Sequence, residues 1–178
     1  MLAPAGSNDF ETYLAAVERF TDEVLIPNEH RLAEEMRIPE DITQQMRELG
    51  LFGISIPEEY GGLGCSQEEQ VRLTFAFTRG SAVYRSRFST TIGLTSQAIL
   101  DFATDEQKQA WLPRMATGEV TGAFALTEPD AGSDAGGLTT TARRDGDHYV
   151  LNGYKRYITN APDADLFLVM ARTDDTQK

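Results

Sequence analysis

The sequence predicts an α+β protein with two domains, an all-α domain over residues 1–120 followed by the start of an antiparallel β-domain over residues 121–178. Two observations predict this class. Apolar residues recur with the helical period up to about residue 120, whereas beyond it the period changes to that of a strand and β-branched and aromatic residues become frequent. The β-region is also short and ends in the polar run RTDDTQK, which indicates a chain that is cut within its second domain.

Helix boundaries in the first domain are marked by capping residues, prolines and glycines. Pro27 should stop the first helix, because proline lacks the amide hydrogen that a helix interior needs. Ser66 with Glu69, and Thr104 with Gln107, form capping-box patterns that are typical of helix starts. We therefore expect helices over residues 8–26, 39–49, 66–84, 86–103 and 104–118.

The second domain has the pattern of short strands joined by tight turns. Asp145-Gly146 and Asn152-Gly153 are dipeptides that supply the positive φ of hairpin turns, so the strands should form an antiparallel meander and not a βαβ unit. The last strand has no obvious neighbour. We expect strands over residues 121–126, 138–144, 147–152, 154–159 and 165–172.

Composition excludes several classes of function. A net charge of −12 repels phosphate backbones and disfavours a nucleic-acid partner. Cys65 is the single cysteine, and the first residues do not resemble a signal peptide, so we expect a cytoplasmic protein without disulfides. No apolar run is long enough to span a membrane. His30 and His148 stand in separate segments without a second ligand at metal spacing, so no metal is expected.

The chemistry-bearing residues gather where the helical pattern gives way to the strand pattern. In LTEPDAGSD, Thr127 and Ser133 supply hydroxyls, and Gly132 permits a turn that other residues resist. In YKRYITN, Tyr157 and Thr159 are two apart, so in a strand they would share a face that suits a planar heteroaromatic ligand. Taken alone, these patterns also fit an ordinary loop beside a strand of mixed polarity. No dinucleotide-binding, P-loop or nucleophile-elbow motif occurs.

Four segments, in order and spacing, resemble the acyl-CoA dehydrogenase family of flavoenzymes: PEEYGGLG at 57–64, TDEQKQAWLPRMATGE at 104–119, ALTEPDAGSD at 125–134 and NGYKRYITNA at 152–161. The resemblance covers essentially the whole chain. It implies a helical domain, a middle β-domain and a C-terminal helical domain, with FAD between the last two. The present sequence would supply the first domain and about half of the second.

The resemblance also implies roles for individual residues. Thr127 would hydrogen-bond the pyrimidine edge of the flavin, and Tyr157 would pack on the ring where many relatives carry Trp. The residues implied in cofactor binding are Leu126, Thr127, Gly132, Ser133, Tyr157, Ile158 and Thr159. Those implied in substrate binding are Phe124 beside the thioester, Ser133 near the pantetheine arm, and Thr90 and Leu94 along the acyl cavity.

The implied reaction is α,β-dehydrogenation of an acyl-CoA thioester to the trans-2-enoyl-CoA. Its base would be a Glu of the C-terminal domain, which this chain does not contain, and none of Glu58, Glu119 or Glu128 matches it. The implied partners are acyl-CoA, an electron-transferring flavoprotein and further copies of the chain in a homotetramer or homodimer.

Other functions stay open at this point. An acyl-CoA oxidase or a related flavin monooxygenase of the same fold would share these motifs, and rates with oxygen against an artificial acceptor would separate them from a dehydrogenase. A non-catalytic helical interaction module is the third hypothesis, and a colourless native protein of 19.7 kDa would favour it.

Overall fold

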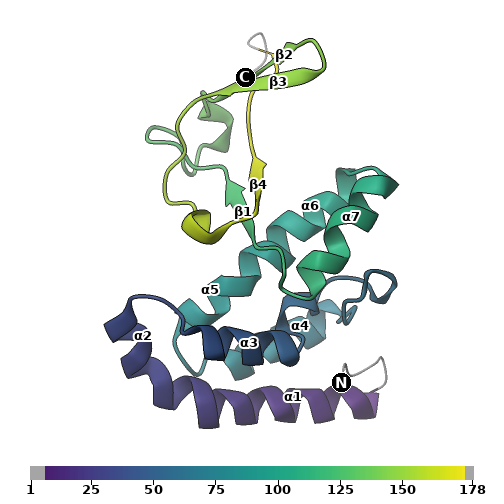
Figure 1. The fold of residues 1–178 in the computed structure, drawn as a ribbon, viewed down its shortest axis with the longest axis vertical. Coiled ribbons are helices and arrows are strands. Elements are labelled where there is room, and N and C mark those ends of the chain that lie inside the picture. The colour runs from purple at the N-terminus through teal and green to yellow at the C-terminus, as the bar shows by residue number, and fades with distance from the viewer. Residues whose placement is uncertain (1–6, 175–178) are drawn as a thin grey trace.

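The computed structural model describes residues 7–174, with side chains from residue 9 onward. The helical domain lies at one end of the molecule and the β-region at the other (Figure 1). Its α-helices are α1 Ser7–Phe20, α2 Glu29–Glu35, α3 Glu40–Glu48, α4 Gln67–Phe77, α5 Ala82–Thr90, α6 Ser96–Phe102 and α7 Asp105–Ala116. The strands are β1 Gly122–Ala125, β2 Thr141–Asp145, β3 His148–Asn152 and β4 Leu166–Val169. The α+β class is therefore confirmed.

Local signals place most helix ends correctly. Both predicted capping boxes form: Ser66 Oγ accepts from the Glu69 amide, and Thr104 Oγ1 accepts from the Gln107 amide. Gly50 follows α3 with a φ of 77°, in the left-handed region that glycine adopts without strain. The side chain of Asn8, at the predicted start of the first helix, lies outside the described residues.

Two helix predictions are wrong in their boundaries. Pro27 does not stop the first helical segment. Instead, α1 continues through a π-helical turn η1 (Thr21–Leu25) into a short 3₁₀ turn η2 (Ile26–Asn28). Pro27 lies in the first turn of η2, where no amide hydrogen is needed. The helix expected over residues 66–84 is divided in two. Ser81 caps the start of α5, accepting from the Val83 amide, so the chain breaks around Gly80.

The core of the helical domain is aromatic and aliphatic. Phe88 of α5 packs edge-on against Phe77 of α4, with ring centroids 5.2 Å apart, and against Phe52, at 6.0 Å. A second cluster around Leu112 and Met115 of α7 lies under the loop that carries Ile56. No helix among the described residues is long and apolar enough to cross a membrane.

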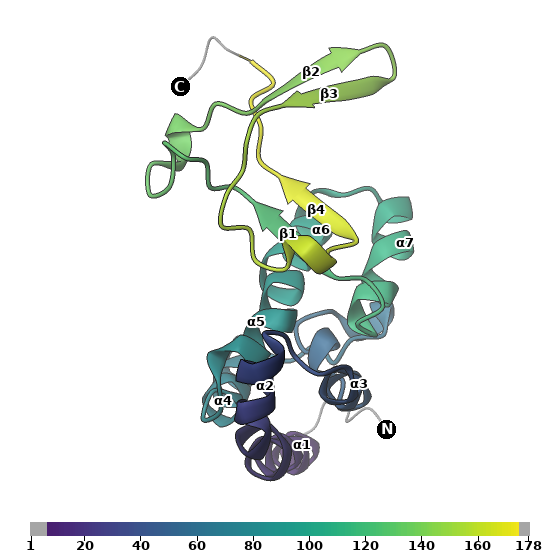
Figure 2. The ribbon, with the colours of Figure 1, turned by 60° about the vertical axis from the view of Figure 1, so that its left-hand side comes forward.

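The β-region consists of two small sheets, not a single antiparallel meander. The β2–β3 hairpin is antiparallel, as predicted, and turns at Gly146 with a φ of 59°. By contrast, β1 and β4 pair in parallel, with Phe124 opposite Leu168 (Figure 2). The last strand therefore has a neighbour that the sequence pattern could not reveal, because the pairing joins segments separated by more than 40 residues.

The strand predicted over residues 154–159 is absent, and Asn152-Gly153 is not a hairpin turn. Gly153 lies so close to Thr140 that a Cβ there would approach its Oγ1 to 2.3 Å. Beyond this contact the chain leaves β3, and Lys155 and Arg156 bond instead to the loop after β1. The segment then ends in a turn in which Tyr157 and Asn160 have φ values of 57° and 65°.

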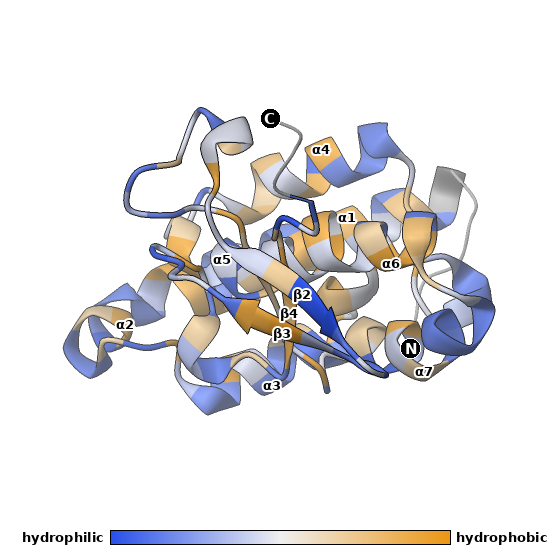
Figure 3. Ribbon diagram, turned by 90° about the horizontal axis from the view of Figure 1, so that it is seen from above, coloured by the Kyte–Doolittle hydropathy of each residue, from blue (hydrophilic) through white to orange (hydrophobic). Residues whose placement is uncertain are grey.

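The hairpin stands away from the helices and is weakly covered. Figure 3 shows hydrophobic residues along β3 and hydrophilic ones toward the end of β2. Tyr149, Val150 and Leu151 of β3 are all more than half exposed.

The two domains meet where β1 contacts a widened helical turn. Between α5 and α6 the chain forms the π-helical turn η5 (Thr91–Thr95). Thr91 Oγ1 accepts from the Gly122 amide at 2.9 Å and donates to the Gly122 carbonyl at 3.4 Å. A Cβ at Gly122 would lie 2.7 Å from Thr95 Oγ1, so only glycine permits this approach. The contact fixes β1, and the loop that follows it, on the helical domain.

Candidate functional site

The candidate site is formed by the loop after β1 and the turn that replaces the predicted fourth strand. The loop of residues 126–134 begins directly after Ala125, and the turn spans residues 155–160. The Arg156 amide donates to the Thr127 carbonyl at 2.9 Å, and Lys155 Nζ donates to the Leu126 carbonyl at the same distance. These bonds bring together two motifs that lie some 30 residues apart in sequence.

The loop is closed on itself by a short antiparallel bridge. The Glu128 amide donates to the Ala131 carbonyl at 2.8 Å, and the Pro129-Asp130 turn lies between them. Gly132 and Ser133 follow on the exposed side, and a Cβ at Gly132 would meet no atom within 4 Å. The loop therefore offers open space beside two backbone amides and a hydroxyl.

Glu128 and Lys155 form a buried ion pair under this loop, with side chains 3% and 11% exposed and 2.8 Å between their charged atoms. Burial alone would raise the pKa of the Glu128 carboxyl, but hydrogen bonds from Lys155, Thr140 and Thr139 outweigh it and hold the pKa below its ordinary value. Glu128 is thus a structural carboxylate, consistent with its exclusion as the base.

The turn presents its side chains differently from the prediction. Tyr157 and Thr159 were expected on one face of a strand, and this is wrong because the segment is a turn. Tyr157 is 79% exposed, its ring lies under the Arg156 guanidinium at 4.2 Å, and Arg156 also donates to its hydroxyl. Thr159 is exposed and Ile158 half-buried.

The turn is also attached to the helical domain. Asn160 Nδ2 donates to the carbonyls of Ser86 and Arg87 in α5, at 3.2 and 3.4 Å. Arg87 donates to Thr121 Oγ1 at 2.7 Å, and burial, followed by the nearby Arg47 charge, lowers its pKa. Asn160, Arg87 and Thr91 are positioning residues that sequence reasoning missed. The ITN motif contained Asn160, but nothing in its spacing revealed the contact with α5.

The predicted substrate residues are spread over both domains. Phe124 is half-buried in β1, while Thr90 ends α5 and Leu94 lies in η5 with 46% exposure. A cavity of about 250 Å³ between α4 and η5 is lined by Phe75, Phe88 and Ile92, and neither Thr90 nor Leu94 lines it.

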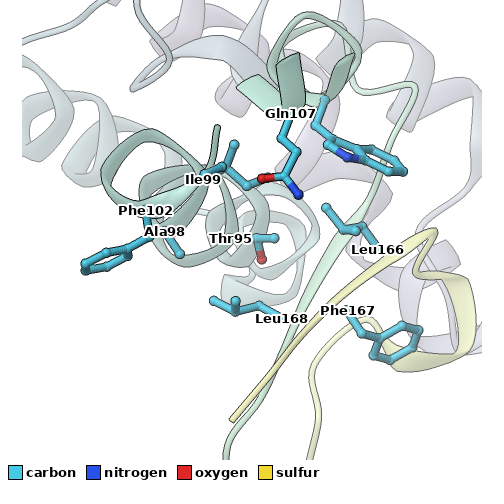
Figure 4. A pocket seen from close by; sticks show the side chains of 10 residues that line it. Thr95, Ala98, Ile99, Phe102, Gln107, Leu166, Phe167 and Leu168 are labelled. Carbon is cyan, nitrogen blue, oxygen red and sulfur yellow. The ribbon is translucent and has the colours of Figure 1, made fainter. Parts of the chain in front are cut away.

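A second cavity, of about 280 Å³, lies between α6, α7 and β4. In Figure 4, Gln107 points between Ile99 and Leu166, whereas Phe102 points away. The residues lining this cavity include none of those implied in cofactor or substrate binding. Within residues 9–174 no cluster of three or more His, Cys, Asp or Glu side chains could hold a metal ion.

Structural comparison first defines a class of fold, which this chain shares with part of the length of two solved enzymes. The chain is similar to a glutaryl-CoA dehydrogenase from Mycobacterium smegmatis solved in complex with FADH2, with a TM-score of 0.87, 36% identity, and coverage of 96% of this chain and 44% of that one. It is also similar to the prolyl acyl carrier protein oxidase AnaB, with a TM-score of 0.85, 33% identity, and coverage of 96% and 46%.

Sequence comparison then gives the family. Residues 7–119 match the N-terminal domain of acyl-CoA dehydrogenases, and residues 123–178 match the middle domain. The chain belongs to the acyl-CoA dehydrogenase family. A 3-(aryl)acrylate reductase from Clostridium sporogenes is 42% identical over 155 residues, which are 87% of this chain and 41% of that protein. The chain thus spans less than half the length of each of these three relatives.

Proposed function

We propose that the chain is the N-terminal part of an FAD-dependent enzyme that oxidises an acyl-CoA thioester to the trans-2-enoyl-CoA. The observation that carries this proposal is the tethering of the 126–134 loop to the 155–160 turn, because both motifs of the family's flavin site then lie in one place. Membership of the family, and the FADH2 complex of a relative, support FAD as the cofactor.

The donor set fits a flavin. Among the described residues, the hydroxyls of Thr127, Ser133 and Thr159 form no hydrogen bond within the protein, so they remain available to a ligand. The polar edge of an isoalloxazine ring accepts and donates hydrogen bonds, and a phosphate accepts them from hydroxyls and backbone amides. The space around Gly132 allows such a group to approach the backbone closely.

Each residue then has a distinct role in the proposed site. Thr127, with the Leu126 backbone beside it, and Thr159 hold the polar edge of the flavin, while Gly132 and Ser133 hold its pyrophosphate. Bound flavin supplies the hydride acceptor for the reaction. Fixed hydroxyls near its polar edge stabilise the negative charge that develops there without needing to reorient. Tyr157 and Ile158 provide the apolar contacts from the turn to the flavin.

The substrate side is proposed by the same resemblance. Phe124 borders the thioester, Thr90 and Leu94 border the acyl chain, and Ser133 also meets the pantetheine arm. Proton abstraction is assigned to a Glu of a C-terminal domain, and no described carboxylate is offered in its place. We assign the role of electron acceptor to an electron-transferring flavoprotein, and we expect a homotetramer or homodimer in the cytoplasm.

A second candidate function uses the same site either to run the reaction in the opposite direction, as a reductase, or to pass the electrons to another acceptor. The similarity to an arylacrylate reductase favours reduction of a conjugated double bond, and the similarity to an oxidase favours transfer of electrons to oxygen. Steady-state rates with an artificial acceptor, with oxygen and with a reductant plus an enoyl substrate separate the three activities.

The cofactor assignment is tested by Thr127→Val, which removes the hydroxyl and keeps the shape. The parent and its variants are studied together with the proposed C-terminal domain, because FAD would lie between that domain and the β-domain. The dissociation constant for FAD, measured by flavin fluorescence, should rise about three- to tenfold, the equilibrium equivalent of one neutral hydrogen bond. Thr117→Val, at the exposed end of α7, is the control and should bind like the parent. Equal affinity in all three proteins would contradict the role of Thr127, and no uptake of FAD by the parent would contradict the function.

A further inference from the structure

We propose that Glu128 and Lys155 are a positioning pair that fixes the flavin-facing hydroxyls of Thr127 and Thr159 relative to one another. The inference rests on the proposed function and adds two residues to it. Neither residue faces the proposed ligand; both act through the segments that they join.

The Glu128 carboxylate is the centre of the arrangement, and it is saturated with donors. Its Oε2 accepts from the amide and the hydroxyl of Thr139, at 2.6 and 2.7 Å. Its Oε1 accepts from the Thr140 amide at 2.9 Å and from Lys155 Nζ at 2.8 Å. One buried side chain therefore holds three segments: its own loop, the chain entering β2, and the turn.

Lys155 extends this network to the backbone of the proposed flavin loop. Its ammonium donates to the Leu126 carbonyl as well as to Glu128, and the next amide, that of Arg156, donates to the Thr127 carbonyl. Residues 126–128 are thus bound at three successive positions. Thr127 cannot rotate its peptide plane without breaking one of these bonds.

A buried charged pair is better suited to fixing the geometry of the segments that it joins than to raising the stability of the fold. A buried ion pair loses so much hydration that apolar replacements are often as stable, whereas charged hydrogen bonds are short and directional. Thr127 lies one residue before Glu128, and Thr159 four residues after Lys155. A shift of Glu128 relative to Lys155 would therefore change the distance between the Thr127 and Thr159 hydroxyls.

The experiment compares FAD-loaded parent protein with the double variant Glu128→Gln/Lys155→Met. The double variant leaves no unpaired buried charge, and the Gln carbonyl can take the place of Oε2 and accept from the amide and hydroxyl of Thr139, so this variant is better able to fold than removal of either charge alone. Lys155→Arg is the second variant, since it keeps the charge and changes the donor geometry. Lys108→Met is the control, because Lys108 of α7 is also mostly covered, at 21% exposure, and its ion pair with Asp105 is long, at 3.9 Å.

Three quantities are measured: the melting temperature, the FAD dissociation constant and the shape of the visible flavin spectrum. We expect both variants at residue 155 to fold, and the double variant to bind FAD roughly tenfold more weakly, the equivalent of one charged hydrogen bond. The flavin band should change shape in both variants and not in Lys108→Met. A purely structural role would lower the melting temperature and leave the spectrum unchanged.

The remaining outcomes overturn the proposal in distinguishable ways. Parent-like affinity and spectrum in the folded variants would show that the pair does not position the site. Loss of folding in the double variant, with a parent-like spectrum in Lys155→Arg, would assign the pair to stability alone. If parent and Lys108→Met both failed to take up FAD, the proposed function itself would fail, and the positioning role with it.

Discussion

The charge state of a single residue near the candidate site depends on how deeply its side chain is buried and on its fixed hydrogen-bond partners. Glu128 is the clearest case, since burial disfavours its charge while Lys155 and two threonines favour it more strongly. The net result is a carboxyl pKa below the ordinary value of 4.5. A group of this kind stabilises the folded state above its unfolded pKa, and the contribution is lost as pH falls toward the folded pKa.

The first prediction at this scale concerns acid unfolding. The free energy of unfolding should fall as pH drops below about 4.5, and the fall should be smaller in Glu128→Gln because that variant has no carboxylate to protonate. Urea unfolding between pH 7 and pH 3 measures it. Glu59→Gln, which removes an exposed carboxylate, is the control and should follow the parent. An equally steep decline in Glu128→Gln would contradict the assignment.

A second residue-scale prediction concerns the single cysteine. Burial, and to a lesser extent the charge of Glu69, raises the pKa of the Cys65 thiol to about 11. Because the thiolate is the reactive form, alkylation at pH 8 should be about a hundredfold slower in the folded chain than in urea. Mass spectrometry after timed iodoacetamide treatment measures both rates. Equal rates would show that Cys65 is accessible and unperturbed.

Individual residues differ in how far the sequence reveals them. The hydroxyls of Thr127, Ser133 and Thr159 belong to two recognisable motifs, at residues 125–134 and 152–161. Glu128 and Lys155 lie within the same motifs, but 27 positions separate them, and no periodicity links two segments that are not regular secondary structure. Their pairing is a tertiary contact, and only the structure reveals it.

At the scale of elements, the contact between η5 and β1 determines where the site lies. The π-helical turn brings Thr91 and Thr95 against Gly122, and the loop with Thr127 follows directly after β1. Widened helical turns of this type are often found at functional sites. Here the turn provides the close approach that attaches the β-domain to the helices.

The prediction at this scale is that Gly122→Ala loosens the attachment. Its Cβ would lie 2.7 Å from Thr95 Oγ1, in a buried contact that cannot relax freely, so we expect a loss of about 1–3 kcal/mol in the free energy of unfolding. Gly93→Ala, in the same turn, is the control, because its Cβ would meet nothing within 4 Å. Chemical denaturation of both variants tests the difference, and equal stability would contradict the account.

Elements governed by local chemistry are predictable, and those governed by distant contacts are not. Ser66, Thr104 and Gly146 act within a few residues of themselves, so their caps and turn are visible in the sequence. The pairing of β1 with β4, and the turn at Tyr157, depend on contacts across the fold. The period-2 pattern around residues 154–159 predicted a strand that does not form. A local pattern contains no information about the hydrogen bond from the Arg156 amide to the loop after β1.

At the scale of the whole molecule, the helical domain is the support and the β-region carries the proposed chemistry. The candidate site lies at their junction, between the helices at one end and the β2–β3 hairpin at the other (Figures 1 and 2). Asn160 links the turn to α5, and Arg87 of α5 links that helix to Thr121 just before β1. Movement of one domain against the other would therefore disturb the proposed flavin contacts.

The most direct test of the central claim uses the protein together with the proposed C-terminal domain, because the proposed base lies there and the present chain alone should be inactive. The FAD-loaded protein is titrated anaerobically with saturated acyl-CoA thioesters of increasing chain length and followed by visible absorption. We predict that at least one of them bleaches the oxidised-flavin band, with formation of one trans-2-enoyl-CoA for each flavin reduced. A protein that takes up FAD and is reduced by none of these thioesters would contradict acyl-CoA dehydrogenation, and one that takes up no FAD would contradict the flavin site itself.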